Sequence, residues 1–150
     1  MVKKIISGGQ TGADQAGLAA GRELSLLTGG TAPHNWWTDS GYAKSLLEVY
    51  GLKPGPYDPR TYPMRTEMNV IFSHGTVIFG NTNSPGTRLT ITYCVDHGRP
   101  YLPNPTPQLL RQWCIDHNIE ILNVAGNRER TNPGIFERTK AILIEAFKES

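Results

Sequence analysis

Short apolar runs alternate with longer segments of helical periodicity along most of the chain, and this alternation is the strongest pattern in the sequence. The apolar runs predict strands at Lys3–Ile6, Leu27–Gly30, Thr76–Phe79, Pro100–Leu102 and Ile119–Val124. The amphipathic or Ala- and Leu-rich segments between them predict helices at about 13–26, 65–73, 84–97, 106–117 and after Asn132-Pro133. Strands and helices that alternate at this spacing indicate an α/β fold of Rossmann type, with a parallel sheet of about five strands and helices on both faces.

Residues 34–64 interrupt this alternation. They contain Trp36, Trp37 and several Gly and Pro residues, with at most a short helix at Ala43–Tyr50. Loops of this length inside a compact domain are usually lids or binding segments. We therefore expect residues 1–150 to form a single domain with an irregular excursion at about 34–64, because a chain of this size can build one sufficient hydrophobic core.

Composition and charge exclude several classes of function. The formal net charge is +2, which is too small to indicate nucleic-acid or membrane binding by bulk electrostatics. No apolar run approaches the roughly 18–20 residues of a membrane span, and the apolar stretch near the N-terminus is too short for a signal peptide, so we expect a cytoplasmic protein. Cys94 and Cys114 are expected to be reduced and buried, and the scattered His residues predict no protein-bound metal site.

A glycine-rich loop follows the first predicted strand and runs directly into a helix. Its candidate binding residues are Gly8, Gly9, Gln10, Thr11, Gly12 and Asp14. Glycines let a ligand approach the backbone, and the unpaired N–H groups at a helix start form an anion site together with the helix dipole. The alternative is a tight turn without a ligand, since the spacing matches neither the ATPase phosphate loop nor the dinucleotide fingerprint. On the binding hypothesis, Gly9→Val should abolish ligand binding with little loss of fold.

Two more loops leave predicted strands at the same end of the sheet, where ligands of such folds bind. The first offers Ser84, Gly86 and Thr87, while Arg88 either adds a charge-assisted bond or lies on the exposed helix face. The second offers four candidates, which are Asn123, Gly126, Arg128 and Glu129. The alternatives are an ordinary helix cap in the first loop and a solvated ion pair between the Arg and the Glu in the second.

Four further side chains are candidates for the rim of the pocket, namely Arg65, Glu67, Asn69 and Trp36. Glu67 could instead stabilise the first turn of the helix that is predicted to begin at Arg65. The Trp36-Trp37 pair could stack on a heterocycle, or it could pack in the core or in a lid. Asp14 could cap its helix or accept a hydrogen bond from a sugar hydroxyl or a base.

Four segments in the same order resemble those of molybdenum cofactor carrier proteins. They are Ser-Gly-Gly-Gln-Thr-Gly-Ala-Asp at 7–14, Thr-Gly-Gly-Thr-Ala-Pro at 28–33, Arg-Thr-Glu-Met-Asn-Val at 65–70 and Leu-Asn-Val-Ala-Gly-Asn-Arg-Glu at 122–129. The resemblance implies a Rossmann-like fold and a homo-oligomer, often a dimer or a tetramer. It also implies binding of molybdenum cofactor, a pterin that carries one phosphate.

This carrier family is similar in turn to the lysine-decarboxylase-like group of cytokinin-activating phosphoribohydrolases, which bind or cleave nucleotides. The activity motif of that group is Pro-Gly-Gly-x-Gly-Thr-x-x-Glu. Residues 84–90 read Ser-Pro-Gly-Thr-Arg-Leu-Thr, so Thr90 stands where the catalytic Glu would be. A threonine hydroxyl cannot serve as a carboxylate acid or base near neutral pH, and this difference favours binding over catalysis.

The sequence supports three hypotheses. The first is a binding protein for a phosphate-bearing small molecule, either molybdenum cofactor (or molybdopterin) or a nucleotide, held on the glycine-rich loops at the carboxyl end of the sheet. The second is a nucleotide hydrolase of the nucleoside-monophosphate phosphoribohydrolase type, with Asp14 or Glu67 in place of the missing carboxylate. The third is a sensor of a nucleotide signal.

Overall fold

The computed structural model describes residues 1–57 and 61–149, with the side chains of all of these except 61–63. Its main sheet has the strand order β5-β2-β1-β8-β6-β7, and every neighbouring pair in it is parallel. The strands are β1 (Lys4–Ile6), β2 (Leu27–Ala32), β5 (Leu52–Pro54), β6 (Gly75–Phe79), β7 (Tyr101–Pro103) and β8 (Ile121–Gly126). The predicted Rossmann-like α/β fold is confirmed, with one more strand than expected, since β5 lies in the segment that is predicted to be irregular.

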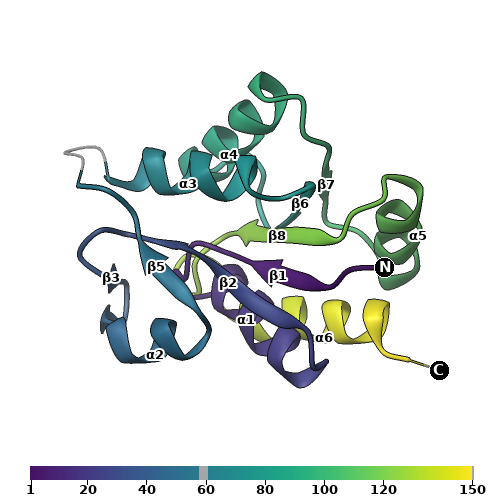
Figure 1. Cartoon of the computed structure of the whole chain (residues 1–150), viewed down its shortest axis with the longest axis horizontal. Helices are drawn as coiled ribbons and strands as arrows, with labels where there is room; N and C mark the ends of the chain where they lie inside the picture. The colour runs from purple at the N-terminus through teal and green to yellow at the C-terminus, as the bar shows by residue number, and fades with distance from the viewer. Residues whose placement is uncertain (58–60, 150) are drawn as a thin grey trace.

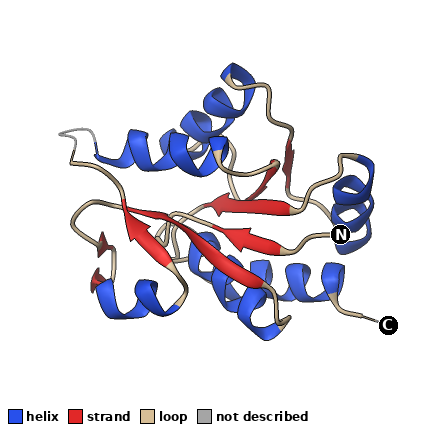
Figure 2. Ribbon diagram, viewed as in Figure 1, coloured by secondary structure: helices blue, strands red, loops and turns tan. Residues whose placement is uncertain are grey.

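Helices cover both faces of this sheet (Figure 1). They are α1 (Ala13–Glu23), α2 (Lys44–Val49), α3 (Thr61–Ile71), α4 (Pro85–Asp96), α5 (Pro107–Asp116) and α6 (Ile135–Phe147). On one face α3 packs against α4, and on the other α1 packs against α6, which also contacts α5. Figure 2 shows the same layers by secondary structure, with the sheet between the two groups of helices. No helix within the described residues combines the length and the apolar composition needed to cross a membrane.

The main core lies on the face covered by α1 and α6. Every second residue of the central strands points toward it, because side chains alternate along a strand. Ile5 of β1, Val77 of β6, and Leu122 and Val124 of β8 are completely buried in this cluster, together with Leu143 of α6. The burial of both faces of the central strands explains why these strands are recognisable in the sequence as short apolar runs.

The segment predicted as an excursion is partly regular. It forms a two-residue antiparallel ladder between β3 (Trp37–Thr38) and β4 (Gly41–Tyr42), followed by α2 and β5. Trp36 is 7% exposed and packs in a second apolar cluster with Leu18, Leu47 and Leu52. The prediction of Trp36 at the pocket rim is therefore wrong, and the core alternative is correct. Residues 58–60 of the excursion lie outside the described residues.

Three helix boundaries differ from the prediction, and two of them affect the site. Helix α1 ends at Glu23, because Ser25 has φ 60° and turns the chain into β2. Helix α3 begins at Thr61 and not at Arg65, so Arg65 and its neighbours lie inside the helix. Helix α6 begins at Ile135 with Gly134 as its N-cap, two residues beyond the predicted Asn-Pro start.

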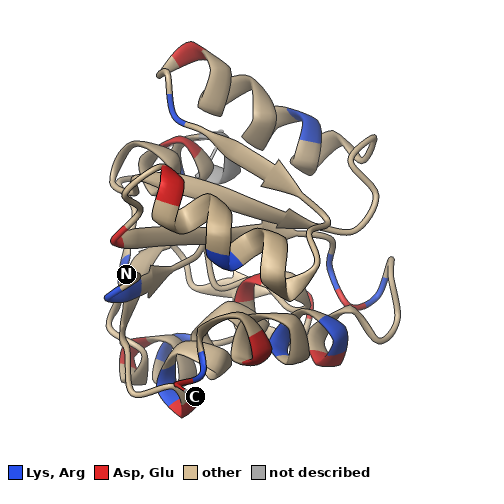
Figure 3. Ribbon diagram, turned by 90° about the vertical axis from the view of Figure 1, so that its right-hand side faces the viewer, with Lys and Arg blue, Asp and Glu red and all other residues tan. Residues whose placement is uncertain are grey.

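The connections around the middle of the sheet create the crevice that is expected of such folds. The chain leaves β1 toward α1 on one face and leaves β6 toward α4 on the other, while β8 lies between these two strands. Diverging connections of this kind leave an open space beyond the carboxyl ends of the strands. Lys and Arg residues are interspersed with Asp and Glu along the ribbon in Figure 3, so any anion site depends on local geometry.

Candidate functional site

A cleft opens beyond the carboxyl ends of β1, β8 and β6. The space between protein atoms there is about 550 Å³, a volume that includes the open solvent at its mouth. The lining residues are Gly8, Gln10, Asp14, Arg65, Thr66, Asn69, Gly86, Thr90, Asn123, Val124, Ala125, Gly126 and Arg128. Candidates from all three predicted loops, and from the helix with Arg65, therefore meet in one place.

The loop at 7–14 uses most of its own backbone donors. The N–H of Gln10 donates to Asp14 Oδ2 at 3.2 Å, and the N–H of Thr11 donates to Gln10 Oε1 at 2.9 Å. At the start of α1, Ala13 N–H donates to the carbonyl of Asn127 at 3.1 Å, and Gln15 N–H to that of Gln10 at 3.1 Å. These bonds leave fewer free amides here than the sequence predicts. The loop thus positions the Asp14 and Gln10 side chains in the cleft.

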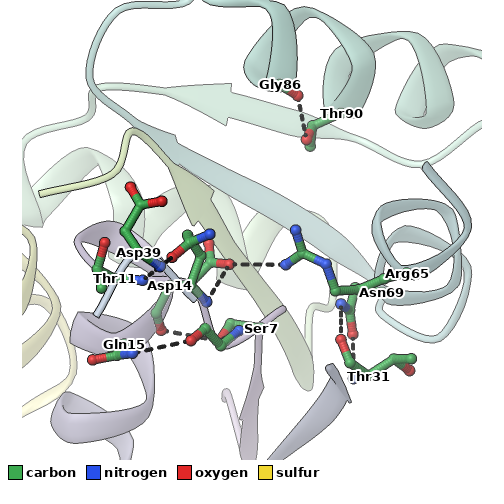
Figure 4. A network of polar contacts seen from close by, with 12 residues as sticks. Ser7, Thr11, Asp14, Gln15, Thr31, Asp39, Arg65, Asn69, Gly86 and Thr90 are labelled. Atoms are coloured by element: carbon green, nitrogen blue, oxygen red, sulfur yellow. Dashed lines mark hydrogen bonds and ion pairs between the residues drawn. The ribbon is translucent and has the colours of Figure 1, made fainter. Parts of the chain in front are cut away.

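Asp14 and Arg65 form a buried ion pair in the cleft. Arg65 Nη1 lies 3.5 Å from Asp14 Oδ2, and each residue is only 9% exposed. Figure 4 shows the guanidinium pointing toward the carboxylate, with Gly86 and Thr90 across from them on α4. Burial raises the pKa of Asp14 from its ordinary 3.8 to about 6, although Arg65, the amide of Gln10 and Arg128 all act to lower it. A carboxyl group that titrates this close to neutrality is typical of functional sites.

We expect Asp14→Asn to stabilise the fold at neutral pH. A carboxyl whose pKa is about 6 when folded and 3.8 when free binds more protons in the folded state between these values, so its ionisation lowers stability as pH rises through that window. The variant lacks this titration, so above pH 7 its free energy of unfolding should exceed that of the wild type by roughly 1–3 kcal/mol. Urea unfolding of both proteins between pH 4 and pH 8 measures the difference. It should vanish near pH 4, and a gap that does not depend on pH would contradict the argument.

The start of α4 supplies the free backbone donors. Ser84 is the N-cap residue, but its Oγ donates to Thr87 Oγ1 at 2.8 Å and caps no backbone amide. Within the described part of the chain, no group accepts from the N–H groups of Gly86 and Thr87. A Cβ built on Gly86 would meet nothing within 4 Å. This residue therefore combines an unpaired amide with open space on the side of the cleft, as an anion site requires.

Asn127 links the loops that surround the cleft. Its Oδ1 accepts from the N–H of Asn81 at 2.6 Å and from Asn132 Nδ2 at 3.1 Å. Its Nδ2 donates to the carbonyl of Asn81 at 3.2 Å, to Ser84 Oγ at 3.3 Å and to Thr87 Oγ1 at 3.5 Å. The side chain is 7% exposed. Asn127 thereby holds the start of α4 against the loop after β8.

One edge of the cleft is formed by the turn between β3 and β4. Asp39 Oδ1 lies 3.0 Å from Arg128 Nη1, and its Oδ2 lies 3.6 Å from Arg130 Nε. The N–H of Asp39 donates to Gln10 Oε1 at 2.8 Å. Asp39 is not among the residues predicted for the site, although the run Thr38-Asp39-Ser40-Gly41 has the polar, glycine-ending composition of a tight turn.

Residues 5–147 match the family described as circularly permutated YpsA SLOG. This chain belongs to the circularly permuted YpsA SLOG family. A solved structure described as "Putative molybdenum carrier protein" from Syntrophus aciditrophicus SB is 32% identical to it. The two superpose with a TM-score of 0.85 over 97% of this chain and 94% of that one. The resemblance to molybdenum cofactor carriers that the sequence motifs indicate is therefore confirmed.

A second structure is far less similar. That of (E)-4-hydroxy-3-methyl-but-2-enyl diphosphate reductase is 14% identical, with a TM-score of 0.40 over 97% of this chain and 60% of that one. This likeness is too distant to carry an argument about the site. No curated protein matches the chain.

Several predicted residues lie outside the cleft of this SLOG-family chain. Glu129 accepts from the N–H groups of Gly134 at 2.6 Å and Phe136 at 3.0 Å, so it caps α6, and these bonds hold its pKa below the usual range. It is not among the residues that line the cleft, and it does not form the alternative pair with Arg128. Glu67 Oε2 pairs with His97 Nε2 at 2.8 Å, away from the cleft. The prediction of Glu67 at the rim is therefore wrong.

The other loop candidates support the cleft of this family member without lining it. Gly9, Thr11, Gly12, Ser84 and Thr87 are not among the lining residues, and Arg88 is exposed on α4. Asn69 does line the cleft, but its amide is fixed by Thr31, to whose carbonyl it donates at 3.0 Å and whose N–H it accepts at 2.9 Å. In the described part of the chain, no three His, Cys, Asp or Glu side chains gather as a metal site would require.

Proposed function

We propose that this protein binds a small phosphate-bearing molecule, molybdenum cofactor or a nucleotide, in the cleft between the loop at 7–14, β8 and α4. The observation that carries the proposal is the unpaired amide pair of Gly86 and Thr87, beside a cleft that Arg65 and Arg128 also line. Backbone N–H groups at a helix start and guanidinium groups are the donors that proteins use for phosphate oxygens.

Two further observations bear on this choice of ligand. Two guanidinium groups line the cleft and each pairs with a carboxylate, Arg65 with Asp14 and Arg128 with Asp39, so the anionic group of a ligand depends mainly on the start of α4. A 32% identical structure is described as a molybdenum carrier protein, and molybdenum cofactor carries one phosphate on a pterin ring. The ligand would place its phosphate at α4 and its ring toward the opposite side of the cleft.

We expect Gly86→Asp to weaken binding of the phosphate-bearing ligand by about 10- to 100-fold, the usual contribution of charge-assisted hydrogen bonds. The new side chain has room, since a Cβ at this position contacts nothing, and an acidic residue in the first turn of a helix stabilises it. The loss would therefore come from repulsion of the anion and filling of its site. Calorimetric titration with molybdopterin, AMP and GMP measures the effect.

The matched control is Thr92→Asp, which changes the charge equally on the exposed side of the same helix. It should leave the affinities unchanged. Equal binding by wild type and Gly86→Asp would show that the phosphate does not lie at α4, and absence of heat with every ligand would refute the proposal as a whole.

Hydrolysis of a nucleotide is the second candidate, and the observation that favours it is Asp14. A buried carboxyl group with a pKa of about 6 in a cleft has the properties of a general acid or base. Thr90 lines the same cleft, but its hydroxyl donates to the carbonyl of Gly86 at 3.1 Å and cannot replace a carboxylate. Incubation with AMP, GMP and ADP-ribose, followed by chromatography for free base, tests this activity. Base release that Asp14→Asn abolishes would support it, and no release at high protein concentration would exclude it for these substrates.

A further inference from the structure

One oxygen of the Asp14 carboxylate has no donor in the part of the chain that the structure describes. Oδ2 accepts from the N–H of Gln10 at 3.2 Å and faces Arg65 Nη1 at 3.5 Å, whereas Oδ1 has no such contact. Asp14 is 9% exposed and lines the cleft. Oδ1 is not one of the buried polar atoms that lack a partner, so it is accessible from the cleft. A ligand bound there can donate a hydrogen bond to it, and would withdraw it from water in doing so.

Asn123 provides a second acceptor on the floor of the cleft. It is 3% exposed, and its Nδ2 donates to Thr76 Oγ1 at 3.2 Å. With Nδ2 directed at Thr76, the Oδ1 of the amide is left to accept from another donor. Within the described residues nothing donates to Asn123 Oδ1.

The two acceptors lie in the same part of the fold. Asn123 pairs in register with Ile6, the last residue of β1, and the loop that carries Asp14 begins directly after that residue. The guanidinium of Arg65 adds N–H donors beside the carboxylate. The cleft therefore presents two acceptor groups and one donor group to a ligand, and Asp14 and Arg65 lie across from Gly86 (Figure 4).

This pattern discriminates between rings. A 2-amino-4-oxopyrimidine edge offers an amino group and a ring N–H as donors next to a carbonyl acceptor. An adenine edge offers only one donor group beside one acceptor, and a hypoxanthine edge lacks the amino group. A site with buried polar groups rejects the analogue that leaves them unpaired. The count of acceptors thus favours the 2-amino-4-oxo edge.

We propose that Asp14 and Asn123 recognise the 2-amino-4-oxopyrimidine edge of the ligand ring, which guanine nucleotides and pterins share, while the start of α4 binds the phosphate. This inference rests on the proposed function and specifies the ring that the phosphate accompanies. Arg65 donates to the ring carbonyl and holds the carboxylate in place.

Titration of the wild-type protein with GMP, IMP and AMP at pH 7.5 tests the inference. GMP should bind at least about 10-fold more tightly than IMP or AMP, because either analogue leaves a buried acceptor unpaired. Dihydroneopterin triphosphate, which has the same ring edge on a pterin, distinguishes the two sources. Tighter binding of this compound than of GTP assigns the site to pterins, and the reverse assigns it to guanine nucleotides.

Asp14→Asn should weaken GMP binding by about 10- to 100-fold and leave AMP nearly unchanged, because the amide is a poorer acceptor than a carboxylate and adds a donor. Asn123→Ala removes the second proposed acceptor, and it should therefore reduce the preference for GMP over IMP. Asp96→Asn, an exposed change at the other end of α4, is the matched control and should have no effect. Unfolding curves confirm that each variant is folded.

The outcomes separate this inference from the proposed function. Equal affinity for GMP, IMP and AMP, all reduced by Gly86→Asp, would overturn ring recognition and leave phosphate binding in place. A GMP affinity that Asp14→Asn does not change would also overturn it. If none of the compounds binds, both proposals fail together.

Discussion

Gly9→Val is expected to lower the free energy of unfolding by about 3–5 kcal/mol, through backbone strain and overpacking together. Gly9 has φ +81°, a conformation that a β-branched residue adopts only under strain. A Cβ there would lie 2.8 Å from Leu47 Cδ1 and 3.0 Å from Leu52 Cδ2, inside the second apolar cluster. The sequence predicts the opposite, a folded variant that does not bind, because it places this glycine against the ligand.

Urea unfolding of Gly9→Val, beside Gly86→Ala as the control, measures this effect. Gly86 has an ordinary helical conformation and open space at its Cβ position, so alanine there should stabilise the protein by about 0.4–1 kcal/mol. A Gly9→Val protein with the unfolding midpoint of the wild type would mean that Gly9 does not face the core.

Asn127→Ala is expected to cost about 2–4 kcal/mol of stability, because it leaves several buried polar partners unsatisfied at once. It should also weaken ligand binding about 10-fold, a change of about 1.4 kcal/mol, since its Nδ2 bonds to Ser84 and Thr87 hold the start of α4. Thermal unfolding and calorimetry with GMP give the two values.

Asn83→Ala serves as the comparison for Asn127→Ala. Asn83 is exposed in the same loop, and it is its backbone N–H, not its side chain, that bonds to Asn81 Oδ1 at 2.9 Å. This variant should behave as the wild type in both measurements. If the two alanine variants lose equal stability, the bonds of Asn127 do not connect the loops as described.

The fold could be predicted from the sequence because the buried parallel strands are short apolar runs between amphipathic helices. Strand β5 was missed for a physical reason. Leu52-Lys53-Pro54 has one buried residue, an exposed lysine and a proline at the edge of the sheet, so it has neither an apolar run nor an alternation. The position of Trp36 could not be predicted either, because it depends on contacts with α2, of which the sequence indicates at most a short helix, and with β5, which has no signal of its own.

The site could be predicted in outline because the carboxyl ends of parallel strands meet at one edge. The details depend on hydrogen bonds that no local pattern reveals. Gln10, whose side chain accepts from Thr11 and Asp39, decides which amides of its loop remain free.

The position at which α3 begins decides which of its side chains face the cleft. Arg65 and Asn69 are four residues apart on one helix face, whereas Glu67 lies on the far side.

The position of β8 has a consequence for the order of events during synthesis. This strand is the last to be translated, yet it alone joins β1 to β6. Until it emerges from the ribosome, the β5-β2-β1 and β6-β7 pieces of the sheet are not paired with each other. Contacts so distant along the chain form late, and the nascent protein therefore acquires its binding floor only when nearly all of it has been made.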